Sequence, residues 1–328
     1  MLALAAGCSS KTLDTAPPTI EPAQPGQSPP QTQAAAGVIR PLDGRPQAAV
    51  FDNRTAQLVI LTSGSASTAP SRVAVLGSQQ ASPRVIELPG PATALTGNGT
   101  GTVYLASHGS YFVLDVSAGR AVRVGLSNAA NVDFTAITRR ADGILVLGAA
   151  DGTVYTLAAG ATAVSSRTSI VGHVDSLAAQ GNTVAALDRS QTSITTIGAD
   201  GKVGQALRAG VGATTMVADP AGRLLVADTR GGQLLVYGVD PLILRQAYPV
   251  RDSPYGLAGS DGLTWVSQTT ANLVIGYDLS TGIPVEKVRY PTVRQPNTLA
   301  FDDAADTLYV VSGAGGGVQV IEHAAGPH

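Results

Sequence analysis

The stretch that decides the fold is Thr298-Leu299-Ala300-Phe301-Asp302, which is followed closely by Leu308-Tyr309-Val310-Val311. Two earlier pairs read Ala48-Ala49-Val50-Phe51-Asp52 with Leu58-Val59-Ile60-Leu61, and Thr215-Met216-Val217-Ala218-Asp219 with Leu224-Leu225-Val226-Ala227. Each pair is typical of two short β-strands joined by a tight turn. The phrase recurs seven times along the chain, so the sequence predicts a repeated all-β fold.

The repeat has a regular period. One apolar residue in the first strand of each copy serves as an anchor, and neighbouring anchors are 39 to 46 residues apart. The anchors are Ala49, Leu95, Ile137, Leu177, Met216, Leu257 and Leu299. A period of about 40 to 45 residues belongs to four-stranded propeller blades. We therefore predict a seven-bladed β-propeller with four-stranded antiparallel blades over residues 37–323. A two-sheet sandwich and a ring of six or eight blades are the alternatives.

The seventh copy supplies three strands before the repeat ends. A missing outer strand would leave an exposed edge that invites aggregation. Residues 37–42, Gly-Val-Ile-Arg-Pro-Leu, precede the first anchor and have no place in blade one. We predict that they pair outside Val318-Gln319-Val320-Ile321 and close the ring. Residues 324–328 are then expected to be a disordered tail.

The amino terminus resembles a targeting signal. Residues 2–10, Leu-Ala-Leu-Ala-Ala-Gly-Cys-Ser-Ser, resemble the end of a bacterial lipoprotein signal peptide. The resemblance implies that Cys8 is lipidated after cleavage, although the apolar stretch is short and no basic region precedes it. Residues 9–36 are rich in Pro, Gln and Thr, and such a composition predicts a disordered tether up to about 80 Å long. The alternative is a chance cysteine beside a few alanines.

Composition narrows the possible partners. The 328 residues carry a net charge of −2 without a run of Lys or Arg, which argues against nucleic acid as a partner. Aromatic residues make up 4%, so platforms for stacking bases or sugars are poor. We expect a monomer without a cofactor. A Cys/His zinc cluster, a phosphate-binding glycine loop and a Ser-His-Asp order with a nucleophile elbow are all missing from the sequence.

Three resemblances follow from short motifs. Leu308-Tyr309-Val310-Val311-Ser312 with Gly317-Val318-Gln319-Val320-Ile321 resembles the repeat of YncE-like (YVTN) propellers, and Ala221–Asp228 resembles the NHL-type repeat. Residues 17–22, 240–248 and 282–288 are similar to the LppL-like family of mycobacterial lipoproteins. The first two resemblances imply a propeller over about residues 37–323. The third implies an extracytoplasmic, lipid-anchored protein on the cell membrane, and it implies no chemistry.

A ring of polar residues is the strongest candidate for a binding site. Propellers bind ligands mostly at one face of the channel, where the innermost strands begin. The residue two before each anchor is polar in all seven copies: Gln47, Thr93, Thr135, Asp175, Thr214, Tyr255 and Asn297. The alternative is that strand starts near water are polar anyway and that Thr suits strands.

Charged loops near that ring supply further candidates. The rim residues are His173, Asp188, Arg189, Asp228, Arg230, Arg251, Asp252 and Arg294. Arg230, Arg251 and Arg294 lie in neighbouring repeats and could bind a small anionic solute. Asp175 and Asn297 loosely match the motifs of lactonase-like, metal-dependent propeller hydrolases, but the family's ligating Glu has no counterpart. A hard cation prefers several carboxylates, so these two residues are weak metal candidates. Solvated loop charges are the alternative.

The leading hypothesis is a non-enzymatic binding or scaffold propeller, anchored by lipid on the extracytoplasmic face of a membrane. It would present its channel face or a blade edge to a cell-envelope protein or ligand. The alternatives are a lactonase-like metal-dependent hydrolase at the channel mouth and a binder of small anions at the arginine loops.

Overall fold

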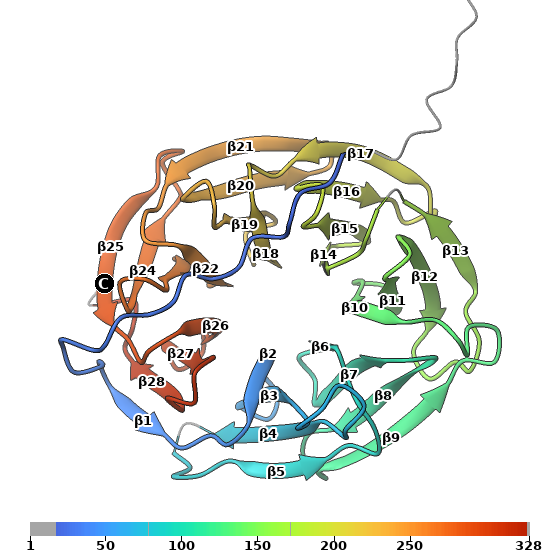
Figure 1. Cartoon of the computed structure of the whole chain (residues 1–328), viewed down its shortest axis with the longest axis horizontal. Helices are drawn as coiled ribbons and strands as arrows, with labels where there is room; N and C mark the ends of the chain where they lie inside the picture. The colour runs from blue at the N-terminus through green and yellow to red at the C-terminus, as the bar shows by residue number, and fades with distance from the viewer. Residues whose placement is uncertain (1–17, 78, 171, 327–328) are drawn as a thin grey trace, which may run out of the picture.

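The computed structural model describes residues 18–77, 79–170 and 172–326. Within these ranges, 28 strands form seven four-stranded sheets that stand as blades around a central axis (Figure 1). The predicted all-β, seven-bladed propeller is therefore confirmed, and the sandwich and the other blade counts are excluded. The described ranges contain no helix long and apolar enough to cross a membrane.

Each blade runs from an innermost strand at the channel to an outermost strand at the perimeter. The strands of blades one to three are β2 (Arg45–Asp52), β3 (Gln57–Ser63), β4 (Arg72–Gly77), β5 (Arg84–Glu87); β6 (Ala94–Gly97), β7 (Thr102–Ser107), β8 (Ser110–Asp115), β9 (Arg120–Gly125); and β10 (Phe134–Arg139), β11 (Ile144–Ala149), β12 (Thr153–Ala158), β13 (Ser166–Ser169). Those of blades four to six are β14 (Ser176–Gln180), β15 (Thr183–Asp188), β16 (Ser193–Ile197), β17 (Val203–Arg208); β18 (Ala213–Ala218), β19 (Leu224–Asp228), β20 (Gln233–Val239), β21 (Leu242–Pro249); and β22 (Pro254–Gly259), β23 (Thr264–Gln268), β24 (Leu273–Asp278), β25 (Val285–Pro291). Blade seven contains β26 (Pro296–Asp302), β27 (Thr307–Ser312), β28 (Val318–Glu322) and β1 (Val38–Arg40). All seven anchors lie in the innermost strand of their blade, as the period predicts.

The core consists of clusters between adjacent blades. Residues 58–61 of β3 show why the second strand of each repeat is apolar throughout, since all four side chains are fully buried. Val59 and Leu61 pack against blade two, whereas Leu58 and Ile60 pack against blade seven. Successive side chains of a strand point to opposite faces, so a strand between two neighbouring blades needs apolar residues on both faces.

The ring closes through strands from opposite ends of the repeat region. β1 pairs antiparallel with β28, with Val38 opposite Val320 and Arg40 opposite Val318. Leu42 follows β1 and is buried in the cluster between blades one and seven. Residues 37–42 therefore complete the seventh blade as predicted, and the edge of β28 is covered.

The predicted disordered tail is wrong for the part that the structure describes. Ala324 is fully buried, and its amide donates to the carbonyl of Asp306 at 2.9 Å. The Tyr290 hydroxyl donates to the carbonyl of Ala324 at 2.9 Å. Ala324 and Ala325 pack against the cluster between blades six and seven, so this part of the chain is ordered against the ring. Residues 327–328 lie outside the described ranges.

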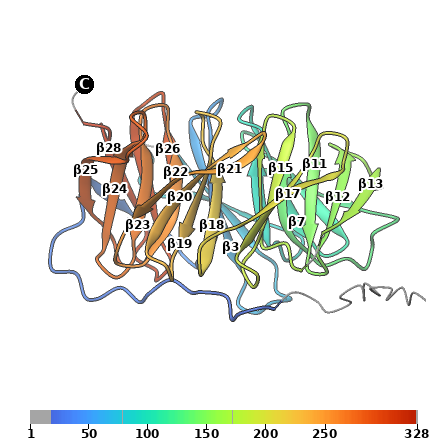
Figure 2. The ribbon, with the colours of Figure 1, turned by 90° about the horizontal axis from the view of Figure 1, so that it is seen from above.

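The disordered tether is also wrong for residues 18–36, which we call the strap. The strap lies along one face of the ring and crosses from blade four to blade seven (Figures 1 and 2). Its composition offers little apolar surface, but its main-chain groups hydrogen-bond to the loops beneath. Those bonds, and prolines that suit an extended chain, replace hydrophobic burial as the source of order. Cys8 and residues 9–17 lie outside the described ranges.

Candidate functional site

The predicted polar ring coincides with irregularities of the innermost strands. In five blades the strand register shifts at the predicted residue, so that this residue is left out of the ladder. These five residues are Gln47, Thr135, Thr214, Tyr255 and Asn297. Thr93 and Asp175 directly precede β6 and β14. A bulge frees backbone groups and re-aims a side chain, which accounts for polar residues at these five positions.

Some of these polar groups join one blade to the next. The Thr93 hydroxyl donates to the carbonyl of Phe134 at 2.7 Å, and the Thr135 hydroxyl donates to the carbonyl of Val174. In blade five the corresponding bond comes from Thr215, one residue after the predicted position, and reaches Tyr255. Thr214 instead shares a hydrogen bond with Thr229 at 2.5 Å. Part of the ring therefore locks the blades together.

Asp175 and Asn297 have separate surroundings. The Asp175 carboxylate accepts the amide of Arg189 at 2.8 Å and lies 3.4 Å from Nδ1 of His173. The Asn297 amide packs against Gly313, where an added Cβ would lie 2.4 Å from Nδ2. No group of three or more His, Cys, Asp or Glu residues that could hold a metal ion occurs within the described ranges. Asp175 therefore has one imidazole beside it, and neither Asp175 nor Asn297 belongs to such a group.

Tyr255 is the largest side chain of the ring. Burial raises the pKa of its phenol, and the nearby positive charge of Arg189 opposes that rise. The side chain is half-buried. Tyr255 thus combines an apolar ring with a neutral hydroxyl at the channel mouth, a combination that is common in binding surfaces.

Two of the rim candidates, Asp188 and Asp228, hold loops of the channel face in place. Asp228, at the end of β19, accepts the amides of Val211, Gly212 and Gly231 at 2.9 to 3.1 Å. Asp188, at the end of β15, accepts the amide of His173 at 2.9 Å. Both carboxylates are buried. Each carboxylate joins two loops of its own blade. One loop leads into the first strand, and the other connects the second and third strands.

The same link recurs in other blades with different chemistry. Ser107 donates to the carbonyl of Pro91, Gln268 donates to that of Arg251, and Ser312 donates to that of Arg294. Each donor stands at the end of the second strand of its blade. This repeated loop clamp makes the channel face rigid, because the incoming loops cannot move independently of the blades.

The rim arginines bind the strap. Arg230 donates to the carbonyl of Glu21 at 2.8 Å, Arg294 donates to that of Ser28 at 3.1 Å, and Arg189 donates to that of Ala23. Arg251 is exposed, and its carbonyl is the acceptor in the loop clamp of blade six. Arg230 and Arg294, two of the three arginines proposed to hold an anion, therefore donate to carbonyl oxygens of the same chain.

Gln295 and Ser28 form the centre of the strap contact, and sequence reasoning missed both. Ser28 is buried, its amide donates to Oε1 of Gln295 at 3.0 Å, and its hydroxyl donates to the carbonyl of Thr269 at 2.6 Å. The Gln295 amide donates to the Ser28 hydroxyl at 2.7 Å, and Nε2 donates to the carbonyl of Gly26 at 2.9 Å. A serine in a proline-rich stretch carries no sequence signal for such a role.

The chain matches no protein-family model and no curated protein sequence. Solved structures match its fold, and they are propellers. A streptogramin B lyase structure is 13% identical with a TM-score of 0.67, covering 88% of this chain and 96% of that one. Virginiamycin B lyase from Staphylococcus aureus is 14% identical with a TM-score of 0.68, covering 85% and 96%. Hydrazine synthase from Kuenenia stuttgartiensis is 12% identical with a TM-score of 0.69, covering 89% and 98%.

These comparisons define the class by fold alone: the chain is a β-propeller. The identities are too low to transfer an activity, and a lyase and a synthase match the fold equally well. The fold is shared, and the function has to be argued from the residues on the channel face.

Proposed function

We propose that this protein is a non-enzymatic binding or scaffold propeller of the LppL-like kind, held by a lipid on Cys8 at the extracytoplasmic face of a membrane. The observation that supports this proposal is the position of the strap. It is fixed to the loops of blades four to seven by side chains such as Arg230, Arg294 and Gln295. An attachment upstream of residue 18 is thereby tied to one face of the ring.

The strap shortens the reach of the anchor. The stretch from residue 9 to residue 17 separates Cys8 from the described chain, and a fully extended stretch of that length spans about 30 Å. The strap-covered face would therefore lie nearer the membrane than a tether of residues 9–36 allows. One acyl chain holds a protein only marginally, whereas two hold it stably, so a diacylated Cys8 suffices as an anchor.

The channel face is built in a way that suits a binding role. The loop clamps fix the incoming loops, and the bulged positions present Gln47 and half-buried Tyr255 to a partner. Asp175 and Asn297 are held in different contacts, so no observation favours the lactonase-like alternative. Arg230 and Arg294 bind the strap, so no observation shows these two arginines directed toward a small anion at the loops.

The anchor is tested by metabolic labelling with a lipid precursor. We expect the wild-type protein to carry label and to fractionate with membranes, and Cys8→Ala to lose both. Cys8→Ala protein that still carried label would refute the anchor. Binding is tested by crosslinking intact cells and recovering partners of wild type and of Tyr255→Ala. Recovery of no stable partner, together with measurable turnover by the purified protein, would refute the binding role.

A further inference from the structure

The face opposite the strap has a polar pocket of about 450 Å³ between blades one and two. Its lining residues are Arg54, Thr55, Gln57, Gln80, Arg84 and Ser117. Arg54, Thr55 and Gln57 lie at the turn from β2 to β3, Gln80 and Arg84 at the connection from β4 to β5, and Ser117 after β8. These turns are at the opposite end of the blades from the loops that hold the strap. The pocket is therefore separate from the channel mouth.

The pocket is positively charged. Two of its six lining residues are arginines, and none is acidic. Within the described ranges, neither Arg54 nor Arg84 takes part in a salt bridge. The neighbouring carboxylate of Asp52 is buried and accepts the amides of Thr55 and Gly101 at 2.9 and 2.7 Å. It also accepts the Thr55 hydroxyl at 2.9 Å, so its bonds among the described residues go to Thr55 and Gly101 and none goes to a guanidinium group.

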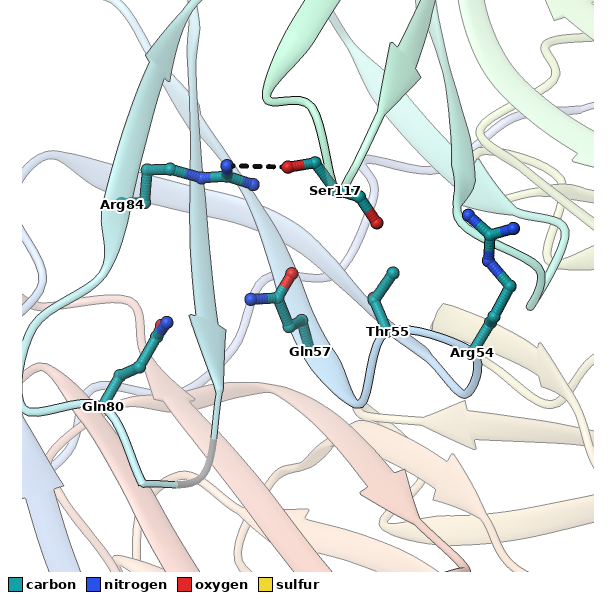
Figure 3. A pocket seen from close by; sticks show the side chains of 6 residues that line it. All are labelled: Arg54, Thr55, Gln57, Gln80, Arg84 and Ser117. Atoms are coloured by element: carbon teal, nitrogen blue, oxygen red, sulfur yellow. Dashed lines mark hydrogen bonds between the residues drawn. The ribbon is translucent and has the colours of Figure 1, made fainter.

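The donors are held in place before a ligand arrives. Arg84 donates to the carbonyl of Ser117 at 3.0 Å and to that of Val116, which fixes its guanidinium across the two blades. Gln80 accepts the amide of Gly77 through Oε1, and its NH₂ group has no acceptor among the described residues. Figure 3 shows Gln57 between Arg84 on one side and Thr55 and Arg54 on the other.

Gly101 explains how Arg54 reaches its position. An added Cβ at Gly101 would lie 2.6 Å from a terminal nitrogen of Arg54, and the residue has a φ of +95°. A side chain there would push the guanidinium away and strain the backbone. The same glycine donates its amide to the Asp52 carboxylate. Gly101 thus makes room for the arginine and also hydrogen-bonds to the nearby acid.

We propose that this pocket binds a phosphate group of a small ligand between the guanidinium groups of Arg54 and Arg84, with Gln57 as a further donor. Guanidinium matches phosphate with two parallel hydrogen bonds, and charge-assisted bonds are the stronger kind. The site lies outside the channel and is independent of the lipid anchor and of the binding role proposed above. A free phosphorylated molecule and a lipid headgroup share this chemistry.

The test uses the full chain and titrates inorganic pyrophosphate by calorimetry at constant ionic strength. Arg54→Gln and Gln57→Glu are the informative variants, because neither side chain bonds to another blade in the described structure. We expect each to weaken pyrophosphate binding about tenfold or more, because Arg54→Gln removes a charged hydrogen bond and Gln57→Glu adds a negative charge beside the phosphate. Arg208→Gln, on exposed β17, removes the same charge elsewhere and should leave the affinity within about twofold.

Vesicles of phosphatidylcholine with and without phosphatidic acid identify the source of the phosphate. Cosedimentation that requires phosphatidic acid and is lost in Arg54→Gln supports the site and indicates a headgroup. Pyrophosphate binding that is lost in Arg54→Gln, without cosedimentation, supports the site and indicates a soluble ligand. If wild type binds neither probe, or if Arg54→Gln and Arg208→Gln lose affinity equally, the proposal is overturned.

Discussion

Replacing Asp228 tests whether the loop clamps stabilise the channel face. The carboxylate is 1% exposed and accepts three backbone amides, from Val211, Gly212 and Gly231. The clamp is tight, since an added Cβ at Gly231 would lie 2.0 Å from a carboxylate oxygen. In Asp228→Ala all three amides lose their acceptor. A buried donor without a partner costs about 1 to 3 kcal/mol.

Water entering the vacated space offsets part of that cost, so we expect Asp228→Ala to lower the free energy of unfolding by about 3 to 5 kcal/mol. Asp228→Asn keeps one acceptor oxygen and places an NH₂ group against at least one amide, so the expected loss is about 1 to 3 kcal/mol. Asp151→Asn is the matched control. Asp151 is exposed and accepts one amide, from Thr153, so its effect should stay within about 0.5 kcal/mol.

The assay is equilibrium unfolding in urea, followed by fluorescence of the single tryptophan, Trp265, and by circular dichroism. Trp265 is fully buried between blades six and seven, where its ring stacks on that of Phe301. Coincident transitions from the two probes justify a two-state treatment. If Asp228→Ala and Asp151→Asn unfolded at the same urea concentration, the clamp would not be a source of stability, and the reasoning would be refuted.

The remaining predictions concern closure, the strap and the tyrosines. Deleting residues 37–42 should lower the thermal midpoint, because it removes buried Leu42, worth about 1.5 to 3 kcal/mol, and uncovers β28; an unchanged midpoint would contradict closure. Gln295→Ala removes two side-chain bonds to the strap and should speed proteolysis within residues 18–36, while Gln24→Ala, at an exposed strap position, should not; equal cleavage rates would argue against Gln295 as the holding residue. Burial raises the pKa of Tyr237, Tyr277 and Tyr309 to about 12. Between about pH 10 and 12 the unfolded chain therefore releases these protons first, and stability should fall as pH rises through that range; ultraviolet titration showing all nine tyrosines ionising near their ordinary pKa would contradict this.

The repeat predicted the ring because its physical basis is local. A strand packed between two neighbouring blades needs apolar residues on both faces, and β3 with Leu58 to Leu61 shows that requirement directly. Closure was predictable for a similar reason: a fourth strand was missing at one end, and an apolar segment was left over at the other. Edges of sheets have to be covered.

The strap and the roles of the polar residues were not predictable in the same way. Composition reports how much apolar surface a segment can bury, and residues 18–36 have little. Their order depends on which donors lie beneath them, and the identity of Gln295 or Arg230 does not reveal a partner more than 200 residues away. The polar ring was located correctly at the strand starts, but Thr93 and Thr135 donate to backbone carbonyls in neighbouring blades, which a sequence pattern cannot distinguish from groups left free for a ligand.

The pairing of β1 with β28 constrains when this protein can finish folding. Blades one to six are each built from consecutive segments and can form as the chain emerges, whereas the last sheet needs Val38 and Val320 at the same time. Until residue 322 is available, the growing molecule is an open arc with an apolar face exposed at each end, between blades one and seven. Such surfaces are prone to aggregate. A factor that shields incomplete chains, or transport of the chain before it folds, would matter most in the interval before these two strands meet.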